Sequence, residues 1–252
     1  TLEQIEKQYM DEMTMLETKL NRLAKNAMGD TPINLASPDD KSVLLYSRKV
    51  KDKSLWSLTF NLGHEMRGNT IKPKMRTRMK NKDFVQYVRR MTDIVYKTIG
   101  RQCETCRGSG RITPLKKDGS VGKAKRICKI CEGKGVVYTS TGEVAGFKLI
   151  PRTPRDTASA GFKTDKVTLE DRLSELSGDA REFCEAYVRY NALRTYLSTF
   201  VEGMKNNVDD YNFIHPEFMQ CVTATGRLSS RNPNFQNMPR GSTFAIRKVV
   251  ES

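Results

Sequence analysis

The spacing of apolar side chains predicts several amphipathic helices. From Leu2 to Met28, apolar residues recur every three or four positions, which places them on one face of a helix. A second helix is expected to begin at Pro38, because Ser37 can cap its first turn and proline is favoured at the first helical position. Further helices are predicted over residues 83–99, where Gly100 is the stop signal, from about Val167, and over residues 180–204.

Other segments have the pattern of strands or loops. Residues 56–62 alternate apolar and polar side chains, which predicts a half-buried strand. The basic tract of residues 71–82 is expected to be an exposed loop that touches nucleic acid, or to be disordered when free. A further strand within residues 209–221 is expected only from the family resemblance described below. Residues 223–240, TATGRLSSRNPNFQNMPR, contain Gly226 and two prolines, so an ordered loop with short extended pieces is predicted.

The size and composition fit a globular protein of one or two domains. The chain has 252 residues, of which 37% are hydrophobic, so it can bury a core. It contains no run of about eighteen apolar residues, and its first residues lack the pattern of a signal peptide. We therefore expect a protein that is not secreted and does not bind membranes. The family resemblance described below implies a location in the cytoplasm or nucleoid, including that of a phage-infected cell.

The positive charge is concentrated in one part of the chain. Residues 48–148 contain 25 Lys and Arg against 8 Asp and Glu, whereas the whole chain has a net charge of +15. This segment is a candidate surface for a polyanion, with salt-dependent binding through counterion release. The alternative is a solvated face that only maintains solubility. The basic candidates for DNA contact are Lys72, Lys74, Arg76, Arg78, Lys116, Lys117, Lys123, Lys125 and Arg126.

Four cysteines have the spacing of a metal site. Cys103 and Cys106 form one C-x-x-C pair, and Cys128 and Cys131 form a second pair 21 residues later. This arrangement suits one tetrahedral zinc ion, and the zinc is expected to be structural because four thiolates leave no open position. Disulfides are the alternative, which a reducing compartment disfavours. Cys184 has no Cys or His nearby and is expected to be a buried thiol.

Each cysteine pair continues as C-x-x-C-x-G-x-G. This longer pattern resembles one half of the zinc-binding region of DnaJ-type co-chaperones, which carry four such repeats where this chain has two. The glycines allow tight turns beneath the sulfurs. The segment between the pairs, PLKKDGSVGKAKR, has a turn signal at Asp118-Gly119 and is expected to be a hairpin tip that reaches a phosphate backbone.

The polar stretch of residues 223–240 closely resembles a signature of family A (DNA polymerase I-like) DNA polymerases, in which TATGRLSS and P-N-L-Q-N-I-P open the palm. In that family the segment lies along the minor groove at the primer terminus. The resemblance therefore implies minor-groove contacts for Arg227, Asn234 and Gln236. From chemistry alone, Arg, Asn and Gln suit a nucleic-acid groove, although a surface loop that meets only water would have the same composition.

Further segments resemble the same family. The segment NLASP resembles the N-L-N-S-P element of the polymerase thumb, which implies that Asn34 and Ser37 contact the primer backbone, as do Lys163 and Thr164 at the thumb tip. The implied fold is α+β and mostly helical, with thumb helices, a basic zinc-ribbon insertion and the first strands of a palm. The implied boundaries are 1–47 and 149–205 for the thumb, 48–148 for the insertion, with the zinc module near 101–140, and 206–252 for the start of the palm.

The catalytic motifs of the family, D-Y-S-Q-I-E and H-D-E, are absent from the sequence. No catalytic residue is therefore assigned, and Mg²⁺ is expected only in the complete nucleotidyltransferase. The chain is expected to hold DNA primer-template, either as one part of a split polymerase whose catalytic palm and fingers lie on another polypeptide, or as a fragment of a longer product. The insertion could clamp DNA or bind a processivity factor. The alternative is a non-enzymatic zinc-ribbon protein that binds nucleic acid or acts like a co-chaperone.

Overall fold

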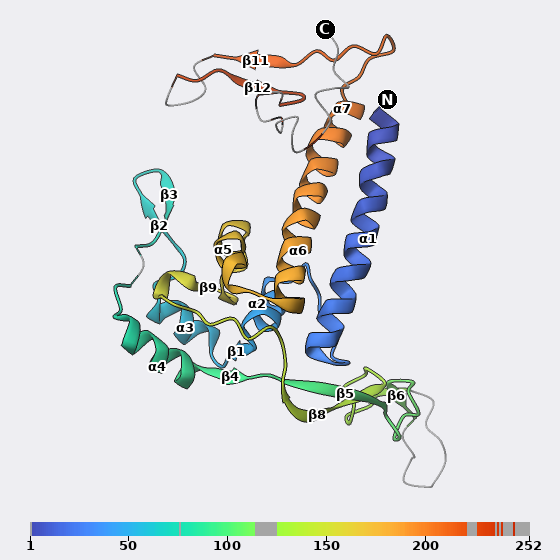
Figure 1. The fold of residues 1–252 in the computed structure, drawn as a ribbon, viewed down its shortest axis with the longest axis vertical. Helices are drawn as coiled ribbons and strands as arrows, with labels where there is room; N and C mark the ends of the chain where they lie inside the picture. Colours follow the sequence, from blue (N-terminus) through green and yellow to red (C-terminus); the bar gives the residue numbers. More distant parts are fainter. Residues whose placement is uncertain are drawn as a thin grey trace. The chain divides into compact units, whose positions relative to one another are not determined.

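Figure 1 shows the computed structural model of the chain, which describes residues 2–75, 77–113, 125–220, 226–234, 236, 238 and 244. The contacts within the chain divide it into two compact units. One unit comprises Thr1–Leu20 and Phe183–Ser252, and the other comprises Asn21–Glu182. Helices combine with small antiparallel sheets, which confirms the predicted α+β class.

The predicted helix start at Pro38 is confirmed by a capping hydrogen bond. α1 spans Leu2–Met28 and α2 spans Pro38–Tyr46. The hydroxyl of Ser37 accepts a hydrogen bond from the backbone N–H of Asp40 (3.4 Å), so it satisfies a donor that the first turn leaves open.

The helices in the second half of the chain also follow the prediction. α5 spans Lys166–Arg172, and the carboxylate of Asp165 caps it by accepting from the N–H of Thr168 (3.1 Å). The long predicted helix of residues 180–204 is present as three consecutive segments. The helical segments of this part are the 3-10 helices η1 (Pro154–Asp156) and η2 (Leu173–Glu175), α6 (Gly178–Tyr196), the π-helical η3 (Leu197–Val201) and α7 (Glu202–Lys205).

The strand predicted for residues 56–62 is wrong. Residues 56–59 belong to helix α3, Lys53–Thr59, whose N-terminus is capped by the carboxylate of Asp52. Trp56 and Phe60 are four residues apart and both buried, whereas Leu58 is 78% exposed. One turn of helix therefore buries the two aromatic rings on the same face, which the alternating pattern alone does not distinguish from a strand.

The helix predicted for residues 83–99 is too long. α4 ends at Met91 (Asn81–Met91), and the chain continues as strands β4 (Thr92–Ile94) and β5 (Tyr96–Gln102). β4 pairs with β1 (Arg48–Val50), and β5 pairs with the distant β8 (Val136–Val144). The predicted stop at Gly100 lies inside β5. Because the pairing partners are far away in sequence, the local apolar spacing could not reveal these strands.

The remaining strands form short antiparallel pairs. The first residues of the predicted basic loop belong to β3, which forms an exposed hairpin with β2; described residues 74, 75 and 77–80 have no regular structure. The short pairs are β2 (His64–Arg67) with β3 (Thr70–Pro73), β6 (Arg111–Ile112) with β7 (Arg126–Ile127), β9 (Thr157–Ala158) with β10 (Gly161–Phe162), and β11 (Glu217–Met219) with β12 (Ser229–Arg231).

An aromatic cluster forms the core of the Asn21–Glu182 unit. The ring of Trp56 lies 4.7 Å from that of Phe60 and 5.4 Å from that of Phe162, measured between ring centroids. The indole N–H of Trp56 donates to the carbonyl oxygen of Ala158 (3.0 Å). Residues 53–60 of the basic segment therefore share one core with residues 157–162.

We expect Trp56→Ala to lower the free energy of unfolding by about 3–5 kcal/mol, because it removes the largest buried side chain of this core and leaves a cavity. The matched control is Leu58→Ala on the same helix, which should change stability by less than about 0.5 kcal/mol because Leu58 is exposed. Urea unfolding followed by circular dichroism measures both variants. Equal losses would show that α3 does not have this buried face.

The other unit is held together by apolar packing and ion pairs between α1 and the α6–α7 segment. Tyr9 packs edge-on against Tyr196, with 5.2 Å between ring centroids. The guanidinium of Arg189 makes two hydrogen bonds to the carboxylate of Glu12, at 2.7 and 2.9 Å, and this carboxylate raises the pKa of Arg189. Lys205 pairs with Glu6. Of the described helices, none is both long enough and apolar enough to cross a membrane.

Candidate metal centre and nucleic-acid surface

The four cysteines of the C-x-x-C pairs form one buried cluster. The Sγ atoms of all four residues lie within 4.8 Å of one another. Cys103 and Cys128 are 3.8 Å apart, and Cys106 and Cys131 are 3.6 Å apart, measured between Sγ atoms. Four sulfurs at the corners of a tetrahedron, each about 2.3 Å from a central ion, would be about 3.8 Å apart. The cluster could therefore hold a metal ion, and none of its cysteines forms a disulfide.

Strand ends position the sulfurs. Cys103 directly follows β5 and Cys128 directly follows β7, so each pair begins where an antiparallel ladder ends. The two loops also bond to each other in equivalent ways. The N–H of Cys103 donates to the carbonyl of Gly135 (2.8 Å), and the N–H of Cys128 donates to that of Gly110 (2.9 Å). The repeated sequence thus folds into two equivalent loops that support each other.

Backbone donors surround the sulfurs. The N–H of Gly110 points to the Sγ of Cys106, and the N–H of Gly135 points to the Sγ of Cys131, both at 3.3 Å. Such donors stabilise thiolate charge and hold ligands in place. The pKa of the Cys128 thiol is lowered to about 7, first by a backbone hydrogen bond from Cys131. Burial of the separate Cys184 raises its pKa to about 12, which confirms the predicted buried thiol.

The close approach of the two loops requires glycine at position 110. Gly110 has a φ of +71°, and a Cβ there would lie 2.2 Å from the carbonyl oxygen of Gly133. Gly142 has a φ of +80°, but a Cβ there would meet nothing within 4 Å. An alanine at either position would be strained by the left-handed backbone conformation. Only at position 110 would its Cβ also clash with a neighbouring atom.

We expect Gly110→Ala to weaken metal binding by at least about tenfold, because the two loops must separate to admit the methyl group. Gly142→Ala is the control and should leave the affinity unchanged within about twofold. Competition with a chelating indicator measures the difference. If the two alanine variants bound metal equally well, the contact between the loops would have no part in the site.

Five of the basic residues predicted to contact DNA are among the residues that the structure describes, and they lie on separate segments. Lys72 is on β3, Lys74 and Arg78 follow it, and Lys125 and Arg126 lie just before Cys128; all five are exposed. The structure does not bring them into one defined site. The predictions for Arg76, Lys116, Lys117 and Lys123, and most of the predicted hairpin tip, fall outside the described residues.

The predicted primer-backbone residues lie on neighbouring segments of one unit. Asn34 and Ser37 precede α2, and Lys163 and Thr164 lie between β10 and α5. α2 holds the latter segment directly, because the hydroxyl of Tyr46 donates to the carbonyl oxygen of Lys163 (3.0 Å). The side chain of Asn34 is itself engaged, since its oxygen accepts from the N–H of Ala36 (2.9 Å).

The predicted minor-groove residues lie around β12. Arg227, Asn234 and Gln236 are all exposed. The extended piece that the sequence predicts is present, because residues 229–231 pair with residues 217–219. Arg231 is engaged locally, since its Nε donates to the carboxylate of Glu217 (2.6 Å) and lowers the pKa of that carboxyl.

Comparisons with known proteins find similarity to DNA polymerases in the C-terminal part of the sequence, which includes these residues. Residues 143–251 match the family model described as DNA polymerase family A. DNA polymerase I of Synechocystis is 41% identical over 86 residues, which cover 34% of this chain and 8% of that protein. DNA polymerase I of Treponema pallidum is 33% identical over 97 residues, 38% of this chain and 9% of that protein. The Bacillus subtilis enzyme is 37% identical over 78 residues, 31% of this chain and 9% of that protein.

The matched regions span less than a tenth of these relatives. The match to the family model does not include the four-cysteine cluster, which lies before residue 143. The part of the chain from residue 143 to residue 251 is therefore similar to DNA polymerase family A.

Proposed function

We propose that this chain holds primer-template DNA as the thumb and the start of the palm of a family A DNA-directed DNA polymerase. The observation that carries the proposal is the match of residues 143–251 to this family, which includes the TATGRLSS and PNFQNMP stretches. The catalytic carboxylates would come from outside the printed sequence, on the same or another polypeptide, and would bind the Mg²⁺ that nucleotidyl transfer requires.

Arg227, Asn234 and Gln236 are proposed to contact the minor groove at the primer terminus. All three are exposed, and their side chains can donate hydrogen bonds. The minor groove presents similar acceptors for every base pair, so donors there can check the shape of a pair without reading its sequence. Asn34, Ser37, Lys163 and Thr164 are proposed to contact the primer backbone.

The four-cysteine cluster is proposed to hold one structural zinc ion. Four thiolates at tetrahedral spacing suit zinc, and they leave no position for a substrate. The zinc would hold Cys128 in place and thereby fix the position of Lys125 and Arg126, which lie just before it in the chain. The basic segment, including Lys72, Lys74 and Arg78, is proposed to bind the DNA backbone, with a processivity factor as the other possible partner.

The paired strands β5 and β8 allow the zinc module to be removed cleanly. Gln102 and Val136 face each other at the end of the ladder, so an Asn-Gly turn can replace residues 103–135. This stretch contains 9 Lys and Arg against 3 Asp and Glu. We expect the deletion to weaken binding to a primer-template duplex by about tenfold at low salt and to flatten its salt dependence, because phosphate contacts are lost.

Fluorescence anisotropy over a range of salt concentrations tests the deletion, with circular dichroism as the control for the remaining fold. Unchanged affinity and salt dependence would overturn DNA binding by the module but leave the thumb proposal intact. Failure of the whole chain to bind duplex, together with DNA-independent binding of unfolded peptides, would instead favour a co-chaperone-like protein.

A further inference from the structure

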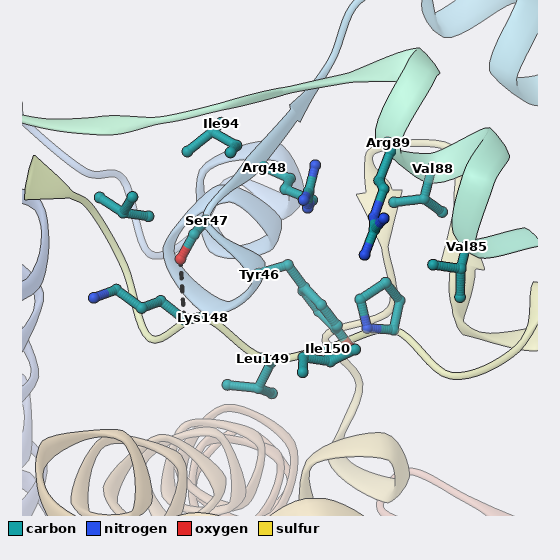
Figure 2. Close-up of a pocket in the computed structure, with 12 residues that line it drawn as sticks. Tyr46, Ser47, Arg48, Val85, Val88, Arg89, Ile94, Lys148, Leu149 and Ile150 are labelled. Carbon is teal, nitrogen blue, oxygen red and sulfur yellow. Dashed lines mark hydrogen bonds between the residues drawn. The ribbon is translucent and has the colours of Figure 1, made fainter. Parts of the chain in front are cut away.

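A pocket of about 260 Å³ lies within the Asn21–Glu182 unit (Figure 2). Three stretches that are distant in sequence form its walls: residues 46–48, residues 85–94 and residues 144–151. Tyr46, Val88 and Leu149 are buried and line the interior. Val85, Ile94 and Ile150 also line the pocket but are 39%, 43% and 75% exposed. Aliphatic side chains from the second and third stretches therefore line the pocket together with Tyr46 from the first.

The pocket is positively charged as well as apolar. Arg48, Arg89 and Lys148 line it, and its lining includes no Asp or Glu. The pKa of the nearby Glu143 is lowered, first by a hydrogen bond from Lys97 and to a smaller extent by the charge of Lys148. Arg48 donates to the hydroxyl of Thr92 (3.2 Å), and among the described residues neither Arg48 nor Arg89 has an ion-pair partner. Figure 2 shows the Arg89 side chain extending from α4 toward Tyr46.

These features fit a peptide better than a nucleotide. The volume is below the roughly 300–1,000 Å³ of sites that enclose a drug-sized molecule, so it suits a single bulky side chain. Tyr46 is the one aromatic residue in the lining and is 1% exposed, so it offers no face on which a base could stack. Arginine pairs well with carboxylates, and exposed aliphatic side chains favour an apolar partner.

We propose that this pocket binds an acidic segment of a partner protein that carries one bulky apolar side chain between carboxylates. The apolar side chain enters the space between Val88 and Leu149, and the flanking carboxylates pair with Arg48 and Arg89. This binding does not depend on the proposed polymerase function, because it rests on the pocket alone.

The test is the affinity of the full chain for a fluorescein-labelled peptide of aspartates with one central phenylalanine, measured by anisotropy. Arg89→Glu is expected to weaken binding by about tenfold or more, because it replaces an attraction with a repulsion. The matched control is Arg90→Glu, which makes the same charge change at the next position of α4. Arg90 lies over the ring of Tyr87 and does not line the pocket, so the loss should stay below about threefold.

A second peptide with serine in place of phenylalanine separates the apolar contribution from charge. It should bind about tenfold more weakly than the phenylalanine peptide. Equal affinities for the two peptides, or equal losses in the Arg89→Glu and Arg90→Glu variants, would overturn the proposal. It would also be overturned if Arg89→Glu reduced binding of a single-stranded oligonucleotide but not of the peptide, because the pocket would then serve nucleic acid.

Discussion

Replacing Cys106 with serine is expected to abolish metal binding and to unfold residues 103–135, while α1, α2 and α6 remain helical. A serine hydroxyl cannot replace a thiolate, so three ligands remain around the ion. Binding of a structural zinc ion contributes on the order of 10–16 kcal/mol in small zinc domains. Among the described residues, only the apolar side chains of Ile112 and Val137 pack against the cysteine cluster, so the module has little apolar core to keep it folded without the metal.

Metal analysis and limited proteolysis measure this effect. The unmodified chain should contain one equivalent of zinc after anaerobic purification, and the Cys106→Ser variant should contain none and be cleaved between residues 103 and 135. Cys184→Ser is the control, because Cys184 is buried on α6 and belongs to the other unit. A chain without metal, or a Cys106→Ser variant that kept its zinc, would rule out the four-thiolate site.

The cysteine cluster could be predicted from the sequence because all its ligands lie in two short copies of one pattern. The spacing of Cys103 and Cys106, repeated at Cys128 and Cys131, was sufficient to predict that the sulfurs meet. The helix start after Ser37 was also predictable, since it depends on a side chain only three residues from the donor that it caps.

Features that depend on distant contacts were missed. The strands after Met91 form because β1 and β8 lie beside them, and neither partner is visible in the local pattern. α3 was mistaken for a strand because the residues that bury its aromatic face, including Tyr87 and Phe162, are distant in sequence. The pocket lined by Arg48 and Arg89 could not be predicted from a sequence motif, because three stretches that are distant in sequence form its walls.

The Arg227→Ala substitution is expected to lower nucleotide incorporation by about a hundredfold in the complete polymerase, meaning this chain together with the catalytic carboxylates. If Arg227 donates to the minor groove at the primer terminus, its loss displaces the end that must react, and small displacements there are costly. Affinity for the duplex should fall by less than about threefold, because many backbone contacts remain. Salt dependence should not change, since a minor-groove donor neutralises no phosphate.

Single-turnover incorporation and duplex anisotropy, measured with the same substrate, separate these effects. Arg231→Ala is the matched control, because Arg231 is exposed on the neighbouring strand β12 but pairs with Glu217. Loss of that surface ion pair should have only a small effect on either quantity. If Arg227→Ala reduced incorporation and affinity equally and also lowered the salt slope, Arg227 would be a phosphate contact, and its assignment to the primer terminus would be wrong.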